Sequence, residues 1–129
     1  MNAIVGLDHT SMCIPAGGED RARAFFTGLL GIAEIAKPTD GNRMDGCWFD
    51  LGAQQLHLLI DEPFVPSKRA HIALTVADLA AVRAQMAGVG LPIVDFLPSD
   101  GRERFFSTDP FGNRLEFIAA TSVADSLRC

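Results

Sequence analysis

The feature that most limits how this chain can fold is a repeated order of strand-like and helical patterns. In the first half, a strand-like run at 7–14 precedes a helical pattern that opens at Glu19 with acidic residues in its first turn. In the second half, a strand-like run at 70–76 precedes a helical pattern that opens after Asp78, a residue type that caps helices. Three more strand-like runs follow each helical pattern. The sequence therefore predicts two copies of a βαβββ unit.

The spacing of apolar residues predicts one amphipathic helix in each half. Apolar positions three or four residues apart form one buried stripe along a helix. In the first half the stripe consists of Ala22, Phe25, Phe26, Leu29 and Leu30. In the second half it consists of Leu79, Val82, Met86 and Val89. Gly31 ends the first pattern, and Gly90 with Pro92 ends the second, as is common at helix C-termini.

Short strand-like runs account for most of the remaining chain. In the first half they are 32–36, 46–51 and 54–60, separated by the turn formers Pro38, Asp40-Gly41 and Gly52. In the second half they are 93–97, 102–108 and 113–119, with Asp109-Pro110 and Gly112 in the last turn. We expect an α+β fold and a single domain over 1–129, with modules at about 5–62 and 68–120. The tail 121–129 carries no clear pattern.

Composition excludes several classes of function. The net charge is −5 and the pI is about 5.0, which argues against an electrostatic nucleic-acid binder. No run of 18 apolar residues exists, so we expect no membrane span, and the first residues lack the pattern of a secretory signal. Cys13, Cys47 and Cys129 are odd in number and widely spaced, which favours reduced thiols and a cytoplasmic protein over a disulfide framework.

All three histidines and one glutamate fall at positions that are equivalent between the two halves. His9 and His71 lie in the first strand of their halves, and His57 and Glu116 lie in the last strand. An ionised carboxylate that faces an apolar interior costs several kcal/mol unless it is paired. Two imidazoles and one carboxylate are the ligands of a 2-His-1-carboxylate centre. The pattern therefore predicts one divalent metal held by His9, His71 and Glu116, with His57 as a fourth candidate ligand.

Each of these residues also has a structural interpretation. His57 taken alone is as compatible with a hydrogen-bonded core residue as with a ligand. Glu116 taken alone could form an ion pair with Arg104 or Arg114 on a neighbouring strand. The combined pattern of four residues favours the metal over these separate explanations.

The sequence resembles the vicinal oxygen chelate superfamily, which includes glyoxalase I, extradiol dioxygenases, methylmalonyl-CoA epimerase, fosfomycin-resistance thiol transferases and bleomycin-binding proteins. The resemblance covers about residues 5–120 and rests on the segments Leu7-Asp8-His9, Arg23-Ala24-Phe25-Phe26, Leu29-Leu30-Gly31 and Asp109-Pro110-Phe111-Gly112-Asn113-Arg114-Leu115-Glu116. It implies two βαβββ modules that form a curled mixed sheet around a metal cleft, with the helices on the outer face. It also implies that His9, His71 and Glu116 are the metal ligands.

One position departs from the glyoxalase I pattern. His57 stands where glyoxalase I carries a glutamate that is both a ligand and the catalytic base. An imidazole differs from a carboxylate in charge and in basicity. The resemblance therefore leaves three roles for His57, namely a fourth ligand, a supporting group or the general base.

The resemblance implies a metal-dependent lyase, isomerase or thiol transferase whose small substrate chelates the metal through neighbouring oxygens. The metal would be Zn, Ni, Mn, Co or Fe. Arg102 and Arg104 are candidates to clamp a substrate carboxylate or phosphonate, and Trp48 and Phe106 are candidates to line the pocket. Alternatives are a sequestering protein of the bleomycin-resistance type, a small ring-cleaving dioxygenase and a purely structural ion. Small two-module relatives also imply a homodimer.

Overall fold

The computed structural model describes residues 2–38, 45–96 and 99–120. The chain divides into two compact units, Met1–Val65 and Pro66–Cys129. The predicted turn at Asp40-Gly41, the strand end at Leu97, Cys129 and the tail 121–129 lie outside the described residues. Within the described part, no helix combines the length and the apolar character that crossing a membrane would require.

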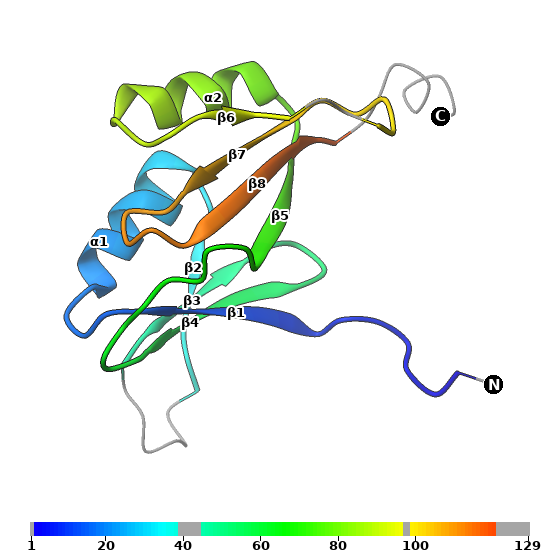
Figure 1. Cartoon of the computed structure of the whole chain (residues 1–129). Coiled ribbons are helices and arrows are strands. Elements are labelled where there is room, and N and C mark those ends of the chain that lie inside the picture. The colour runs from blue at the N-terminus through cyan, green and yellow to red at the C-terminus, as the bar shows by residue number, and fades with distance from the viewer. Residues whose placement is uncertain (1, 39–44, 97–98, 121–129) are drawn as a thin grey trace. The chain divides into compact units, whose positions relative to one another are not determined.

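The first unit is a four-stranded mixed sheet with one helical connection (Figure 1). In chain order its elements are β1 (His9–Ile14), α1 (Glu19–Arg23), the π-helical segment η1 (Ala24–Leu29), β2 (Glu34–Ile35), β3 (Cys47–Asp50) and β4 (Gln55–Ile60). The strand order in the sheet is β1-β4-β3-β2. β1 runs parallel to β4, and the other two pairs are antiparallel.

The second unit repeats this topology. In chain order its elements are β5 (His71–Val76), α2 (Leu79–Gly88), β6 (Val94–Asp95), β7 (Arg104–Thr108) and β8 (Arg114–Ala119). The strand order is β5-β8-β7-β6, with β5 parallel to β8. Asp78 caps α2 as predicted, because its side chain accepts a hydrogen bond from the backbone N–H of Ala81. The prediction of an α+β fold with two βαβββ modules is confirmed.

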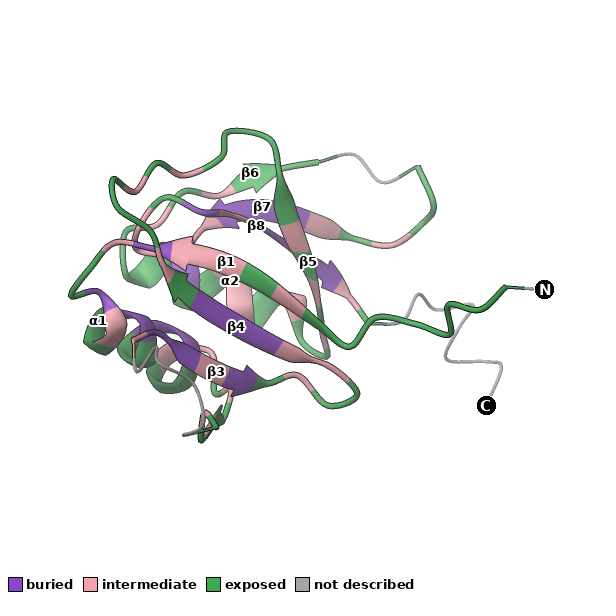
Figure 2. Ribbon diagram, turned by 90° about the horizontal axis from the view of Figure 1, so that it is seen from below, coloured by how far each residue is buried: buried purple, intermediate pink, exposed green. Residues whose placement is uncertain are grey.

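Each unit buries a cluster of apolar residues between its helix and one face of its sheet. In the first unit the ring of Phe26 in η1 lies 5.3 Å from that of Phe49 in β3. In the second unit α2 packs on β7 and β8. Figure 2 shows the result as buried segments along β3, β4, β7 and β8. Because side chains alternate along a strand, the polar residues between these apolar ones point to the other face of each sheet.

The first helical segment differs from the regular helix that the sequence predicts. After Arg23 the chain continues as a π-helix, in which the N–H of Leu30 donates to the carbonyl of Phe25, five residues earlier. The wider turn changes the angular spacing of the side chains that follow. Ala22, Phe25 and Phe26 are buried as predicted, but Leu29 and Leu30 are only half-buried. The predicted stripe is therefore wrong in its last two residues.

Candidate metal centre

The two faces of the second sheet carry different side chains. Arg83 of α2 lies 5.0 Å from the ring centroid of Phe105, and Phe105 stacks on Phe117 at 5.2 Å, so these residues define the helix side. The opposite side is called the site face, and it carries Phe106, Arg114 and Glu116 with His71 of β5. It is thus built from strands whose register brings residues distant in sequence together.

His71 and Glu116 meet on the site face. The Nε2 atom of His71 lies 3.2 Å from the Oε1 atom of Glu116. The side chain of Glu116 is only 9% exposed, whereas that of His71 is 31% exposed. A carboxylate buried to this degree needs cationic partners to offset its lost hydration.

The hydrogen bonds of His71 indicate which ring nitrogen carries the proton. Nδ1 lies 2.9 Å from the backbone carbonyl oxygen of Arg69, which also accepts a hydrogen bond of 3.1 Å from Nη1 of Arg114. Because this carbonyl is the nearest acceptor, we assign the proton to Nδ1. Nε2 then faces Glu116, and a shared cation, either a proton or a metal ion, would bridge the two groups. Such a carbonyl contact is also how metal-binding histidines are oriented.

The distance between these two atoms fits ligands of one metal. Ligand atoms at about 2.1 Å from an ion lie about 3.0 Å apart at a right angle and about 3.4 Å apart at a tetrahedral angle. The observed separation of 3.2 Å falls between these values. Among the described residues, no group of three or more His, Cys, Asp or Glu side chains is placed to hold a metal ion. Of the three predicted ligands, His71 and Glu116 thus meet in the second unit, and their ligand role, like that of His9, stays a prediction.

Arg104 holds the other oxygen of Glu116. Its Nη1 atom donates to Oε2 of Glu116 over 3.3 Å, and its Nη2 atom bonds the carboxylate of Asp100. The latter bond lowers the pKa of the Asp100 carboxyl below its ordinary value. Arg102 is not at this site, because its guanidinium donates to the backbone carbonyl of Ala119. The two arginines predicted to bind substrate thus both have partners within the unit.

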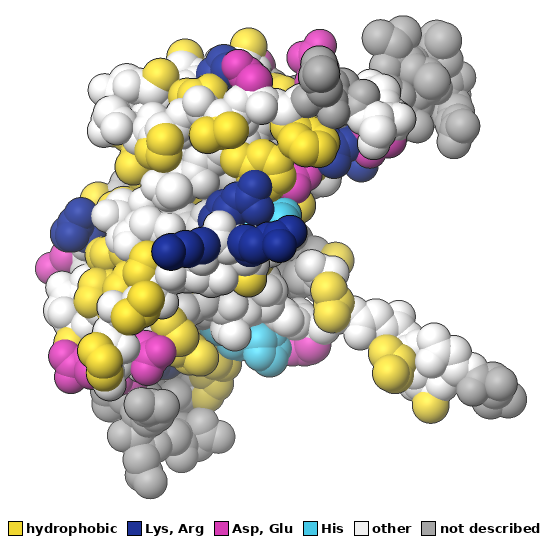
Figure 3. All heavy atoms as spheres, viewed as in Figure 1, with side chains coloured by type: hydrophobic (Ala, Val, Ile, Leu, Met, Phe, Trp, Pro, Cys, Tyr) yellow, Lys and Arg dark blue, Asp and Glu magenta, His cyan; other side chains and the backbone are white. Residues whose placement is uncertain are grey.

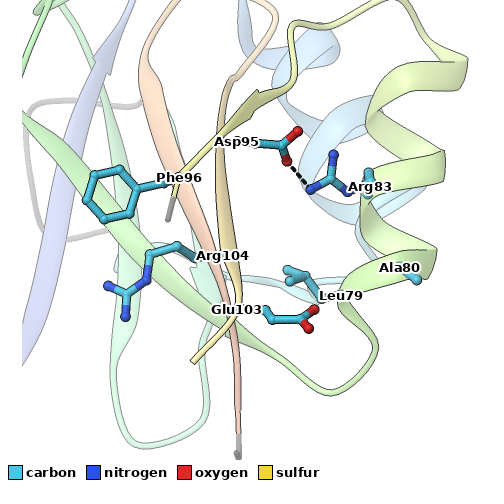
Figure 4. A pocket seen from close by; sticks show the side chains of 7 residues that line it. All are labelled: Leu79, Ala80, Arg83, Asp95, Phe96, Glu103 and Arg104. Carbon is cyan, nitrogen blue, oxygen red and sulfur yellow. Dashed lines mark hydrogen bonds and ion pairs between the residues drawn. The ribbon is translucent and has the colours of Figure 1, made fainter. Parts of the chain in front are cut away.

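A separate hollow of about 230 Å³ lies beside α2. Figure 4 shows that Phe96 and Arg104 point to one side of the strands, while Glu103 and the ion pair of Arg83 with Asp95 lie on the side of α2. The orientation of Arg104 away from α2 agrees with its contact to Glu116. Glu103 carries the same charge as Glu116 but is exposed on the opposite side.

The turn before β8 fixes where the strand that carries Glu116 begins. The carboxylate of Asp109 is buried and accepts hydrogen bonds from the backbone N–H groups of Phe111 and Asn113 and from the Asn113 amide. Burial raises the pKa of Asp109, whereas these hydrogen bonds act in the opposite direction. This closed turn explains the Asp-Pro-Phe-Gly-Asn sequence that leads into β8.

In the first unit, His57 lies in a stack of three rings. The Trp48 ring lies 3.7 Å from the His57 ring at an interplanar angle of 3°, and the His9 ring lies 4.1 Å away on a plane tilted by 18°. Nε2 of His57 is 2.9 Å from Oε1 of Gln55, and Nδ1 of His9 is 2.9 Å from a carboxylate oxygen of Asp8. The structure therefore brings His9 and His57 together, with Trp48 stacked on His57.

This stack bears on the role of His57. Burial, and then the nearby His9, lower the pKa of the His57 imidazole below its ordinary value, which favours the uncharged ring. The lone pairs of two stacked rings lie in nearly parallel planes. Ligation of one ion by both His9 and His57 would therefore require one ring to turn. The role of His57 as a fourth ligand stays a prediction.

Sequence reasoning missed the place of one side chain here. Arg114 was considered only as an ion-pair partner of Glu116, yet the register of β5 and β8 sets it directly opposite His71. Strand alternation does put Gln55 on the face of His57, and their contact agrees with that spacing. The pairing of β5 with β8 has no comparable local signal.

The chain belongs to the Glyoxalase/Bleomycin resistance protein/Dioxygenase superfamily, whose sequence pattern matches residues 6–117. Among solved structures, a glyoxalase family protein from Bacillus anthracis is 36% identical, with a TM-score of 0.85 over 94% of this chain and 99% of that one. No sequence among curated proteins matches the chain.

Two more distant structures share the fold. One is a variant of the fosfomycin resistance protein FosX from Listeria monocytogenes, complexed with Mn(II) and 1S,2S-dihydroxypropylphosphonic acid. It is 15% identical, with a TM-score of 0.74 over 98% of this chain and 99% of that one. The other is a lactoylglutathione lyase from Agrobacterium tumefaciens, which is 16% identical, with a TM-score of 0.70 over 92% and 96% of the two chains.

Proposed function

We propose that this chain is a divalent-metal-dependent enzyme of the glyoxalase-like kind that acts on a small substrate with neighbouring oxygen atoms. The observation that carries the proposal is the contact between Nε2 of His71 and Oε1 of Glu116, where an imidazole nitrogen and a buried carboxylate lie 3.2 Å apart. The Mn(II) complex of a protein with the same fold supports it further.

In this proposal His71, Glu116 and His9 hold the metal, which supplies Lewis acidity to the bound substrate oxygens. Arg104 orients Glu116 through the carboxylate oxygen that faces away from His71. His57, whose lowered pKa favours the uncharged ring, is the candidate to accept a proton from the substrate. Trp48 and Gln55 fix the plane of the His57 ring.

Metal titration tests the proposal. The metal-free chain is expected to bind about one divalent ion, and the ions to titrate are Mn²⁺, Zn²⁺, Ni²⁺, Co²⁺ and Fe²⁺. His71→Ala is expected to lower the affinity for the most tightly bound of these ions by about 10-fold or more, since it removes a ligand. Thr75→Ala, on the same strand, is the matched control and should leave affinity unchanged. Wild-type affinity in the His71→Ala variant would exclude this site.

We also propose a homodimer, which the superfamily resemblance supports. Light scattering or sedimentation over a range of micromolar concentrations should give about twice the chain mass of 13.8 kDa. A single species at the chain mass across that range would reject the dimer.

A further inference from the structure

Arg114 is a cation without an acidic partner next to the proposed metal ligands. Among the described residues, Arg23, Arg83 and Arg104 each form an ion pair with a carboxylate. Arg114 forms none, and neither does Arg102, but both guanidinium donors that Arg102 uses are bound to the carbonyl of Ala119. The whole chain carries a net charge of −5, so carboxylates are in excess. The guanidinium of Arg114 is half-buried, yet it pairs with none of these carboxylates. The lack of a carboxylate partner therefore needs an explanation.

The guanidinium of Arg114 is held in place by uncharged groups. It lies 4.0 Å from the ring centroid of Phe106, a cation–π contact, and Nη1 donates to the carbonyl of Arg69. These two contacts fix the plane of the guanidinium and occupy one of its five N–H donors. The remaining donors are available for a planar, bidentate contact with an oxyanion.

The position of Arg114 relates it to the proposed metal. It precedes Glu116 by two residues on the site face of β8, and its Nη1 lies 3.4 Å from Nδ1 of His71. Lys68 and Arg69 come directly before β5 and add positive charge to this part of the surface. Figure 3 shows Lys and Arg side chains gathered beside a histidine.

We infer that Arg114 binds the anionic group, a carboxylate or a phosphonate, of a substrate whose other oxygens reach the metal. The inference rests on the proposed function and transfers the anion-binding role from Arg102 and Arg104. Those two guanidiniums are engaged by Ala119 and by Asp100 with Glu116. Arg114 is held by Phe106 and a carbonyl, without an ion pair to a carboxylate of the described residues.

Calorimetric titration with methylphosphonate and with acetate tests this, on the metal-free and on the Mn²⁺-loaded chain. Arg114→Met is expected to weaken binding of at least one probe by about 10-fold or more, because it removes charged hydrogen bonds. Arg114→Lys should be intermediate, since lysine keeps the charge and loses the bidentate geometry. Arg83→Met, a charge loss on the side of α2, is the matched control and should bind both probes as the wild type does. The affinity of Arg83→Met for Mn²⁺ should stay within twofold of that of the wild type.

The outcomes separate this inference from the proposed function. A loss confined to methylphosphonate identifies a phosphonate group, and one confined to acetate identifies a carboxylate. A wild-type chain that binds neither probe, or an Arg114→Met variant that binds both as tightly as the wild type, overturns the inference. If the chain takes up no metal but binds a probe through Arg114, the metal proposal fails and the anion site stands.

Discussion

Replacing Glu116 with Gln is expected to lower the affinity of the chain for a divalent metal by more than the roughly 10–100-fold that loss of a supporting group costs. The substitution keeps the shape of the side chain and removes the charge that faces Nε2 of His71 at 3.2 Å. Arg104 keeps its bond to Asp100, so the variant retains a partner for that guanidinium. Metal affinity is measured by competition with a chelator, and folding by circular dichroism during thermal unfolding.

Glu103→Gln is the matched control for this variant. It makes the same change one residue before β7, at an exposed position on the side of α2 (Figure 4). The control should bind metal as the wild type does. Should Glu116→Gln also bind as the wild type, Glu116 would be a structural partner of Arg104, which is the alternative that the sequence left open.

Much of the fold was predictable because its signals are local. Within two of the strand-like runs, the apolar pairs Leu56 and Leu58, and Leu115 and Phe117, flank a polar residue. This alternation alone assigns each residue to a face of the sheet. The helix cap at Asp78 is equally local. The π-helical turn after Arg23 was not predictable, because the apolar spacing there also fits a regular helix.

The candidate site was likewise predictable only in part. The pairing of His71 with Glu116 followed from their equivalent places in the repeat and from strand alternation. The partners of the arginines did not follow, because a long side chain reaches several residues and sequence does not say which carbonyl or carboxylate it meets. Arg102 and Arg104 were therefore assigned to substrate, although Arg102 meets the carbonyl of Ala119 and Arg104 meets Glu116, whereas Arg114, which packs on Phe106, was not assigned to substrate.

Gly46→Ala is expected to destabilise the first unit by about 3 kcal/mol or more, or to prevent folding. Gly46 precedes β3 with a φ of +84°, a conformation that costs an L-residue about 1–2 kcal/mol. A Cβ atom there would lie 2.1 Å from the backbone carbonyl oxygen of Leu58 in β4, which a side-chain rotation cannot relieve. The strands would have to separate where Trp48 stacks on His57.

Trp48 is the only tryptophan, so its fluorescence during urea unfolding reports directly on this part of the sheet. Gly88→Ala is the matched control, because Gly88 lies in α2 with open space around it and alanine should stabilise a helix there by up to about 1 kcal/mol. The Gly46→Ala transition should move to clearly lower urea, while that of Gly88→Ala should stay or rise. Equal urea midpoints for Gly46→Ala and the wild type would mean that β3 and β4 do not approach each other this closely. The stacking of Trp48 on His57, which depends on that pairing of β3 with β4, would then be wrong.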